Sequence, residues 1–137
     1  MKLRTTILAI CDYASTSKEG KVSINGIFDE IYVQKFPGGL ARAFLVATFI
    51  GEPNTTYSLK INLESKAGKV LNTNNVVTTT SANSRNNLIV ELNGLGFEKE
   101  GDYKFVIYDG AREVGSTELK VMNVGDRQQQ ATFKLPN

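Results

Sequence analysis

Few side chains in this 137-residue chain could perform catalysis. The sequence holds one cysteine, Cys11, and no histidine, so a thiol nucleophile would lack the imidazole base that usually activates it. The absence of histidine also excludes a Ser–His pair, imidazole zinc ligands and an imidazole pH switch. One cysteine excludes an internal disulfide and a metal site built from several thiolates. We therefore expect Cys11 to be a small core residue.

Paired carboxylates are the other candidates for acid–base chemistry, at Asp29–Glu30 and at Glu98 with Glu100. Neighbours in a strand point to opposite faces, so we expect Asp29 and Glu30 not to converge on one substrate. Glu98 and Glu100 flank Lys99 beside a turn, which is typical of solvated loop charge. The sequence lacks a calcium-binding loop and a glycine-rich phosphate loop followed by a helix. We predict no catalytic, cofactor-binding or metal-binding residues, and a chain that is not an enzyme.

The charge pattern argues against two classes of partner. Sixteen basic residues and fourteen acidic ones give a net charge of +2. No basic block stands out, so we expect neither nucleic acid nor a membrane as a partner. The apolar run Ile7 to Cys11 is shorter than the ~7–15 residues of a signal-peptide core, and no run approaches the ~18 apolar residues of a membrane span. We therefore expect a cytoplasmic protein, or one in a particle assembled in the cytoplasm.

The pattern of the sequence predicts that its secondary structure consists of β-strands. Tyr57, Leu59, Ile61 and Leu63 alternate with polar residues, and turn signals recur about every 8–12 residues along the chain. This spacing predicts an all-β fold, an antiparallel β-sandwich of seven to nine strands over residues 1–122, immunoglobulin-like or C2-like. The predicted core residues are Phe44, Val46, Leu59, Ile61, Val90, Leu92, Phe105 and Ile107.

Two segments of this sandwich are less regular. Residues 72–87 are rich in Asn and Thr, and we interpret them as a short edge strand around 76–80 between two polar loops. Tyr103 follows Gly101–Asp102 at a predicted corner. Immunoglobulin-like sandwiches often place a tyrosine at such a corner with its hydroxyl bonded to the backbone. A plain core tyrosine is the alternative.

The candidate binding residues lie in a loop and in the tail. Phe36 lies beside Pro37, Gly38 and Gly39, and aromatic residues are enriched at binding hot spots. The tail, residues 123–137, is polar until residues 132–135, where Phe133 and Leu135 restore a strand-like alternation. That segment could dock as an extra strand on its own domain or on a neighbour. Phe36, Phe133 and Leu135 are therefore the predicted interaction residues.

Several motifs resemble a known family. They are Cys11-Asp12-Tyr13-Ala14, then residues 20–29 with Phe36-Pro37, and later residues 101–105 through Asp109-Gly110 and Gly115. Together they resemble a family of small bacterial and phage proteins catalogued only as a domain of unknown function. The resemblance implies a β-sandwich and offers no activity, cofactor or site residue.

The functional prediction is an association. We expect a non-catalytic interaction module of unknown partner, which binds a protein or associates with itself as a homo-oligomer. The alternative is a structural subunit of a phage particle or of another homomeric assembly, by analogy of fold. A cofactor-free enzyme that uses carboxylates and lysines is the least favoured function.

Overall fold

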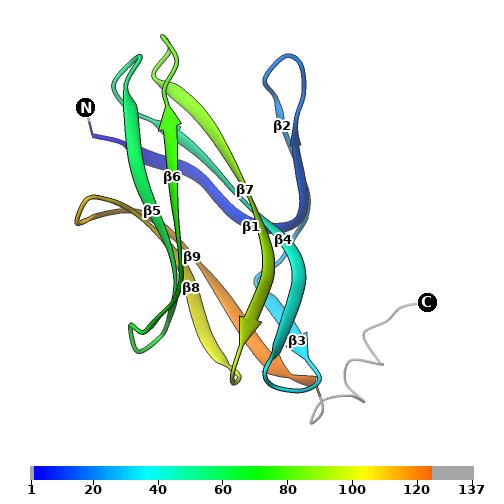
Figure 1. Ribbon diagram of the computed structural model, residues 1–137. Coiled ribbons are helices and arrows are strands. Elements are labelled where there is room, and N and C mark those ends of the chain that lie inside the picture. The colour runs from blue at the N-terminus through cyan, green and yellow to red at the C-terminus, as the bar shows by residue number, and fades with distance from the viewer. Residues whose placement is uncertain (1, 125–137) are drawn as a thin grey trace.

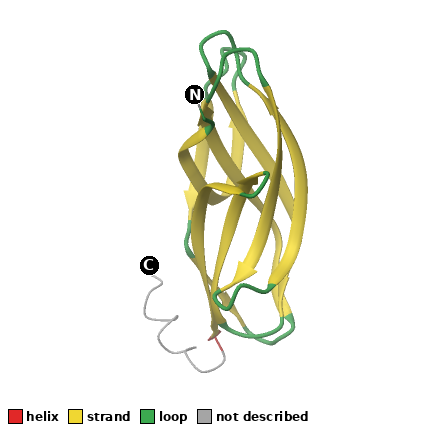
Figure 2. Ribbon diagram, turned by 90° about the vertical axis from the view of Figure 1, so that its left-hand side faces the viewer, coloured by secondary structure: helices red, strands yellow, loops and turns green. Residues whose placement is uncertain are grey.

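The computed structural model describes residues 2–124, which form two packed β-sheets (Figure 1). Loops gather at the two ends of the long strands (Figure 2). The nine strands of the described residues are β1 (Arg4–Thr16), β2 (Val22–Ile27), β3 (Glu30–Val33), β4 (Gly38–Ile50), β5 (Thr56–Ser65), β6 (Val70–Thr79), β7 (Arg85–Phe97), β8 (Gly101–Asp109) and β9 (Arg112–Asn123). No helix in this part of the chain is long and apolar enough to cross a membrane.

The strand order is that of an immunoglobulin-like sandwich. One sheet has the order β2-β1-β4-β7 and the other β3-β9-β8-β5-β6. The pair β4–β7 and the trio β5–β8–β9 correspond to strands B–E and C–F–G of immunoglobulin domains. The predicted antiparallel β-sandwich is confirmed, and one of its strand pairs is parallel. After β2 the chain crosses to the other sheet, where β3 runs parallel to β9.

The core lies between the two sheets. Strand β4 contributes Leu45, Ala47 and Phe49 to it, and β5 contributes Leu59, Ile61 and Leu63. Seven of the eight predicted core residues are buried, and Val90 is half-buried. Phe44 and Val46 are buried on the opposite face of β4, outside the sandwich. Because β4 is apolar on both faces, the sequence pattern could not show which face points to the main core.

The β1–β2 hairpin accounts for that second cluster. The first half of β1 pairs with β4, whereas its second half pairs with β2. Ala14 and residues of β2 pack on Phe44 and Val46, and Asn87 Nδ2 of β7 donates to Gly20 O at the hairpin tip (3.4 Å). The hairpin therefore reaches over the outer face of the four-stranded sheet, beside β4 and β7 (Figure 1).

A glycine allows β1 and β2 to bend where they do. Gly26 has φ +71°, and a Cβ there would lie 2.4 Å from Asp12 Oδ2. L-residues rarely adopt this conformation, and Asp12 leaves no room for a side chain. The interruption of the strand pattern at Asn25–Gly26 is thus explained by a close approach between the two strands.

Tyr103 forms the corner that the sequence predicts. It lies at the start of β8, its ring is buried, and its hydroxyl donates to Lys99 O at 2.6 Å. The ring centroid is 4.7 Å from that of Phe97, at the end of β7. The hydrogen bond to the backbone a few residues upstream is the feature that separates a tyrosine corner from a plain core tyrosine.

Candidate functional site

The thiol of Cys11 is buried inside the domain. Cys11 has no solvent exposure and belongs to the cluster with Phe44 and Val46. Its single S–H lies within donating distance of two carbonyl oxygens, Tyr13 O at 3.5 Å and Phe44 O at 3.6 Å. Burial raises the pKa of the Cys11 thiol, and the charge of Asp12 adds to the effect. A buried thiol with a raised pKa stays protonated, so it is poorly suited to act as a nucleophile.

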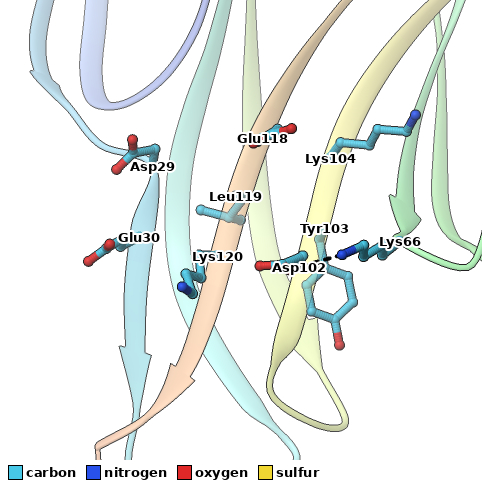
Figure 3. Close-up of a pocket in the computed structure, with 9 residues that line it drawn as sticks. All are labelled: Asp29, Glu30, Lys66, Asp102, Tyr103, Lys104, Glu118, Leu119 and Lys120. Carbon is cyan, nitrogen blue, oxygen red and sulfur yellow. Dashed lines mark ion pairs between the residues drawn. The ribbon is translucent and has the colours of Figure 1, made fainter.

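A hollow of about 490 Å³ lies on the outer face of β3, β9 and β8 (Figure 3). Charges of opposite sign are neighbours across the strands, because Lys120 of β9 lies opposite Glu30 of β3 in the strand register and opposite Asp102 of β8. Lys66 Nζ is 4.0 Å from Asp102 Oδ2, and both side chains are largely exposed. Exposed pairs of this kind contribute little energy, about 0–1 kcal/mol. The hollow is lined by four carboxylates and three lysines, and it therefore has the character of a solvated sheet face of mixed charge.

Asp29 and Glu30 depart from the prediction that they would diverge. Strand β3 begins only at Glu30, so the alternation of strand side chains does not extend to Asp29. Both carboxylates line the hollow, and their side chains leave the chain on the same side (Figure 3). Within residues 2–124, no group of three His, Cys, Asp or Glu side chains is placed to hold a metal ion.

Of the three predicted interaction residues, the structure describes only Phe36. Phe36 is half-buried and packs against the main core, in the loop before β4. The glycines beside it serve the fold, because a Cβ at Gly39 would lie 1.9 Å from Leu95 O of β7. Phe133 and Leu135 lie outside the described residues, and so does most of the predicted tail segment. The role of all three residues stays a prediction.

The edge strand predicted around residues 76–80 is β6, and its free edge is longer than the sequence indicated. Within the described part of the chain, β6 pairs with β5 on one side, and it ends its sheet on the other. Its ten residues include no charged residue and no proline. Val77 is 61% exposed and Val70 is 47% exposed. The backbone donors and acceptors along this edge are available to another strand.

The other edge strands differ in ways that discourage pairing. Strand β7 carries Arg85 and Glu91 and a positive φ at Gly94, and β3 has four residues and begins with Glu30. Strand β2 is uncharged, but it has six residues and is interrupted at Gly26. Charge, bulges and short length are the usual protections of sheet edges, and β6 has none of them over residues 72–79.

Side-chain hydrogen bonds explain why the Asn- and Thr-rich segment is a continuous strand. Thr73 Oγ1 donates to Asn62 Oδ1 at 2.9 Å, and Asn86 Nδ2 donates to Thr78 Oγ1 at 2.6 Å. At the end of β6, the buried Thr80 hydroxyl accepts from Thr55 N at 3.0 Å. The predicted edge strand is therefore confirmed, but it is longer than predicted, because tertiary bonds outweigh the loop preference of asparagine.

A buried carboxylate extends this network to β8. Glu64 is 8% exposed, and its Oε2 accepts from Tyr108 Oη at 2.9 Å and from Asn62 Nδ2 at 3.3 Å. The hydrogen bond to Glu64 raises the pKa of Tyr108, and burial adds to it. The hydrogen bonds from Thr73 to Tyr108 connect β6, β5 and β8. They hold β6 in an ordered conformation at the edge of the sheet. The uncharged, β-branched run Val76–Thr80 is the sequence signal on which the prediction of an edge strand rested.

A family model covers most of the chain. It is described as a family of unknown function (DUF6941) and matches residues 6–122. The chain belongs to this family. The match includes all the strands from β2 to β8 and nearly all of β1 and β9. No curated protein matches the chain.

Solved structures share the fold of this family member at low sequence identity. A Pseudomonas fluorescens alkylpurine DNA glycosylase, AlkC, bound to DNA with an abasic-site analogue, aligns with a TM-score of 0.53 and 10% identity, over 88% of this chain and 30% of that one. An immunoglobulin-like protein from Pseudomonas aeruginosa aligns with a TM-score of 0.46 and 12% identity, over 88% of this chain and 97% of that one. The chain therefore spans less than a third of the glycosylase, and the likeness concerns the fold.

Proposed function

We propose that this domain is a non-catalytic interaction module, which binds a protein partner by adding one of the partner's strands to the free edge of β6. The observation that carries the proposal is that edge: ten residues without charge or proline at the end of a five-stranded sheet. Strand addition to an exposed sheet edge is a recurring mode of peptide recognition, in which main-chain hydrogen bonds supply the affinity.

The rigidity of β6 supports this function. Thr73, Thr78 and Thr80 tie the strand to β5, β7 and the loop before β5. Because the edge strand is already ordered, it loses little conformational entropy when a partner strand binds. The buried, protonated thiol of Cys11 and the solvated charges of the hollow support a non-catalytic role.

The exposed side chains of β6 indicate the chemistry of the partner strand. Thr73, Asn75, Val77 and Thr79 alternate along the outward face of the sheet. Cross-strand pairs between β-branched residues are favourable. A charged residue on the partner strand would have no residue of opposite charge facing it in β6. The partner segment is therefore an extended, uncharged strand rich in β-branched residues.

The test uses one variant on the edge and a matched control. Val77→Lys adds a charge to the β6 edge, and Ile27→Lys makes the same kind of change at a 66% exposed position on β2. Proteins recovered from the native host with the wild-type domain are identified, expressed and purified, and their affinity for each variant is measured. We expect Val77→Lys to weaken binding at least about tenfold, or ~1.4 kcal/mol, and Ile27→Lys to leave it unchanged.

Hydrogen exchange locates the contact. A purified partner should protect amides of β6 and leave those of β7 unaffected. Equal affinity for wild type and Val77→Lys, or protection of a surface other than β6, would overturn the proposal.

A further inference from the structure

We infer that the occupant of the β6 edge is a second copy of this chain, which pairs β6 with β6 across a two-fold axis. The inference rests on the proposed function and names its partner. The result is a dimer in which two five-stranded sheets join into one continuous sheet. Three properties of β6 and its surroundings favour this pairing: the lack of charge in the strand, its regular register and the weak repulsion between more distant charges.

The first step is the absence of charge. A two-fold interface places the same surface of both copies in contact, so a charged residue near the axis faces its own like charge. Like charges directly opposite each other destabilise a strand pair. Strand β6 has no charged residue in its ten positions, so it can pair with itself without such repulsion. Strand β7, at the edge of the other sheet, carries Arg85 and Glu91.

The second step is the register. Residues 72–79 pair regularly with β5, and the irregularity of this pairing lies before them, between Leu63 and Glu64 of β5. An antiparallel pair centred on Asn75 places Thr73 of one copy opposite Val77 of the other, twice. Both copies then keep the same face of the sheet outward, because residues directly opposite one another share a face. This register covers each exposed Val77 with a β-branched residue.

The third step is the charge of the neighbouring strand. Lys60 of β5 lies opposite Asn75 in the sheet. In the dimer the two copies of Lys60 are three strand spacings apart, about 14 Å. That distance exceeds the screening length of ~8 Å at physiological salt, so their repulsion is weak. The small net charge of +2 per chain adds little to it.

The first experiment measures mass in solution by sedimentation against concentration. Wild type is expected to rise from 15.0 kDa toward twice that mass. Asn75→Lys places two like charges opposite each other and should lower the association constant at least tenfold. Asn25→Lys, the same change at an exposed position on β2, is the matched control and should behave as wild type. A mixture of Asn75→Lys and Asn75→Glu should recover the dimer, because opposite charges then meet at the axis.

A second variant tests the register directly. In Asn75→Cys the two new thiols face each other, with Cα atoms about 4.5–5.5 Å apart, within the range of a disulfide. Oxidised glutathione should convert this variant into a covalent dimer, while Asn25→Cys should stay monomeric under the same conditions. Cys11 is buried and does not compete.

The outcomes separate the two proposals. A wild-type chain that stays at 15.0 kDa at every concentration overturns the self-pairing, and β6 protection by a different purified protein would still support the proposed function. A dimer that persists unchanged in Asn75→Lys, or an Asn75→Cys variant that does not cross-link, overturns the self-pairing as well. If in addition no partner protects β6 amides, the proposed function fails with it.

Discussion

The hydroxyl of Tyr103 offers a quantitative test of the immunoglobulin-like corner. It donates to Lys99 O at 2.6 Å, while the ring is 6% exposed and packs against Phe97. Tyr103→Phe removes the hydrogen bond and keeps the ring. Any change in stability can therefore be assigned to the hydroxyl and its acceptor.

The expected loss follows from the position of the acceptor. Lys99 is exposed, so water can replace the hydroxyl at its carbonyl, and no large penalty for an unsatisfied group arises. The loss should be that of a typical net hydrogen bond, about 1 kcal/mol, which corresponds to roughly 3–5 °C in Tm for a domain of this size. Tyr103→Ala also removes the buried ring and should cost ~3–5 kcal/mol.

The same hydroxyl predicts a pH dependence. Burial raises the pKa of Tyr103, and the charge of Glu98 adds to the effect. The folded state thus holds this proton more tightly than the unfolded state, whose pKa is about 10. The resulting stability is fully present below pH ~10 and is lost as the pH rises through the folded pKa. The gap between wild type and Tyr103→Phe should therefore shrink above pH ~10.

The assay is denaturant unfolding of both proteins at neutral and at alkaline pH. Tyr108 is present in both and cancels in the comparison. An unchanged stability of Tyr103→Phe at neutral pH would refute the corner hydrogen bond. A loss above ~3 kcal/mol would show that the ring itself had moved, and a gap that widens at alkaline pH would refute the assigned direction of the pKa shift.

Three further predictions concern the interior. The Cys11 thiol should not react with a thiol reagent in the native state and should react once upon unfolding; rapid native reaction would contradict its burial. Ile61→Ala should cost ~2–5 kcal/mol, and Val90→Ala should cost less because Val90 is half-buried; equal losses in thermal melts would show that this difference in packing is wrong. Asn86→Ala should cost ~1 kcal/mol through its bond to Thr78, and faster amide exchange should appear in β6; unchanged exchange would show that the bond does not hold the edge.

The sequence predicts strands whose burial alternates. Leu59, Ile61 and Leu63 of β5 and Phe105 and Ile107 of β8 fall on the inward face as expected, because one face of each strand meets the core. The tyrosine corner was also predictable, since it depends on a local arrangement of Gly101, Asp102 and Tyr103.

Features that depend on distant partners were not predictable. The length of β6 follows from bonds between Thr73 and Asn62 and between Thr78 and Asn86, which join separate strands. The parallel pairing of β3 with β9 follows from a crossover of the chain between the two sheets. Hydrophobic periodicity does not indicate which sheet a strand joins. The sequence indicated an edge strand around residues 76–80, but it did not indicate that this edge extends over the whole of β6.

Strand addition at the β6 edge can be tested by residue-resolved amide hydrogen exchange of the full chain at low and at high concentration. We predict that the β6 amides that point away from β5 exchange freely in the dilute protein and gain protection as the concentration rises, while amides of β7 do not change. A β6 edge whose exchange is the same at every concentration, and with every purified partner, would contradict the claim that this domain works by strand addition.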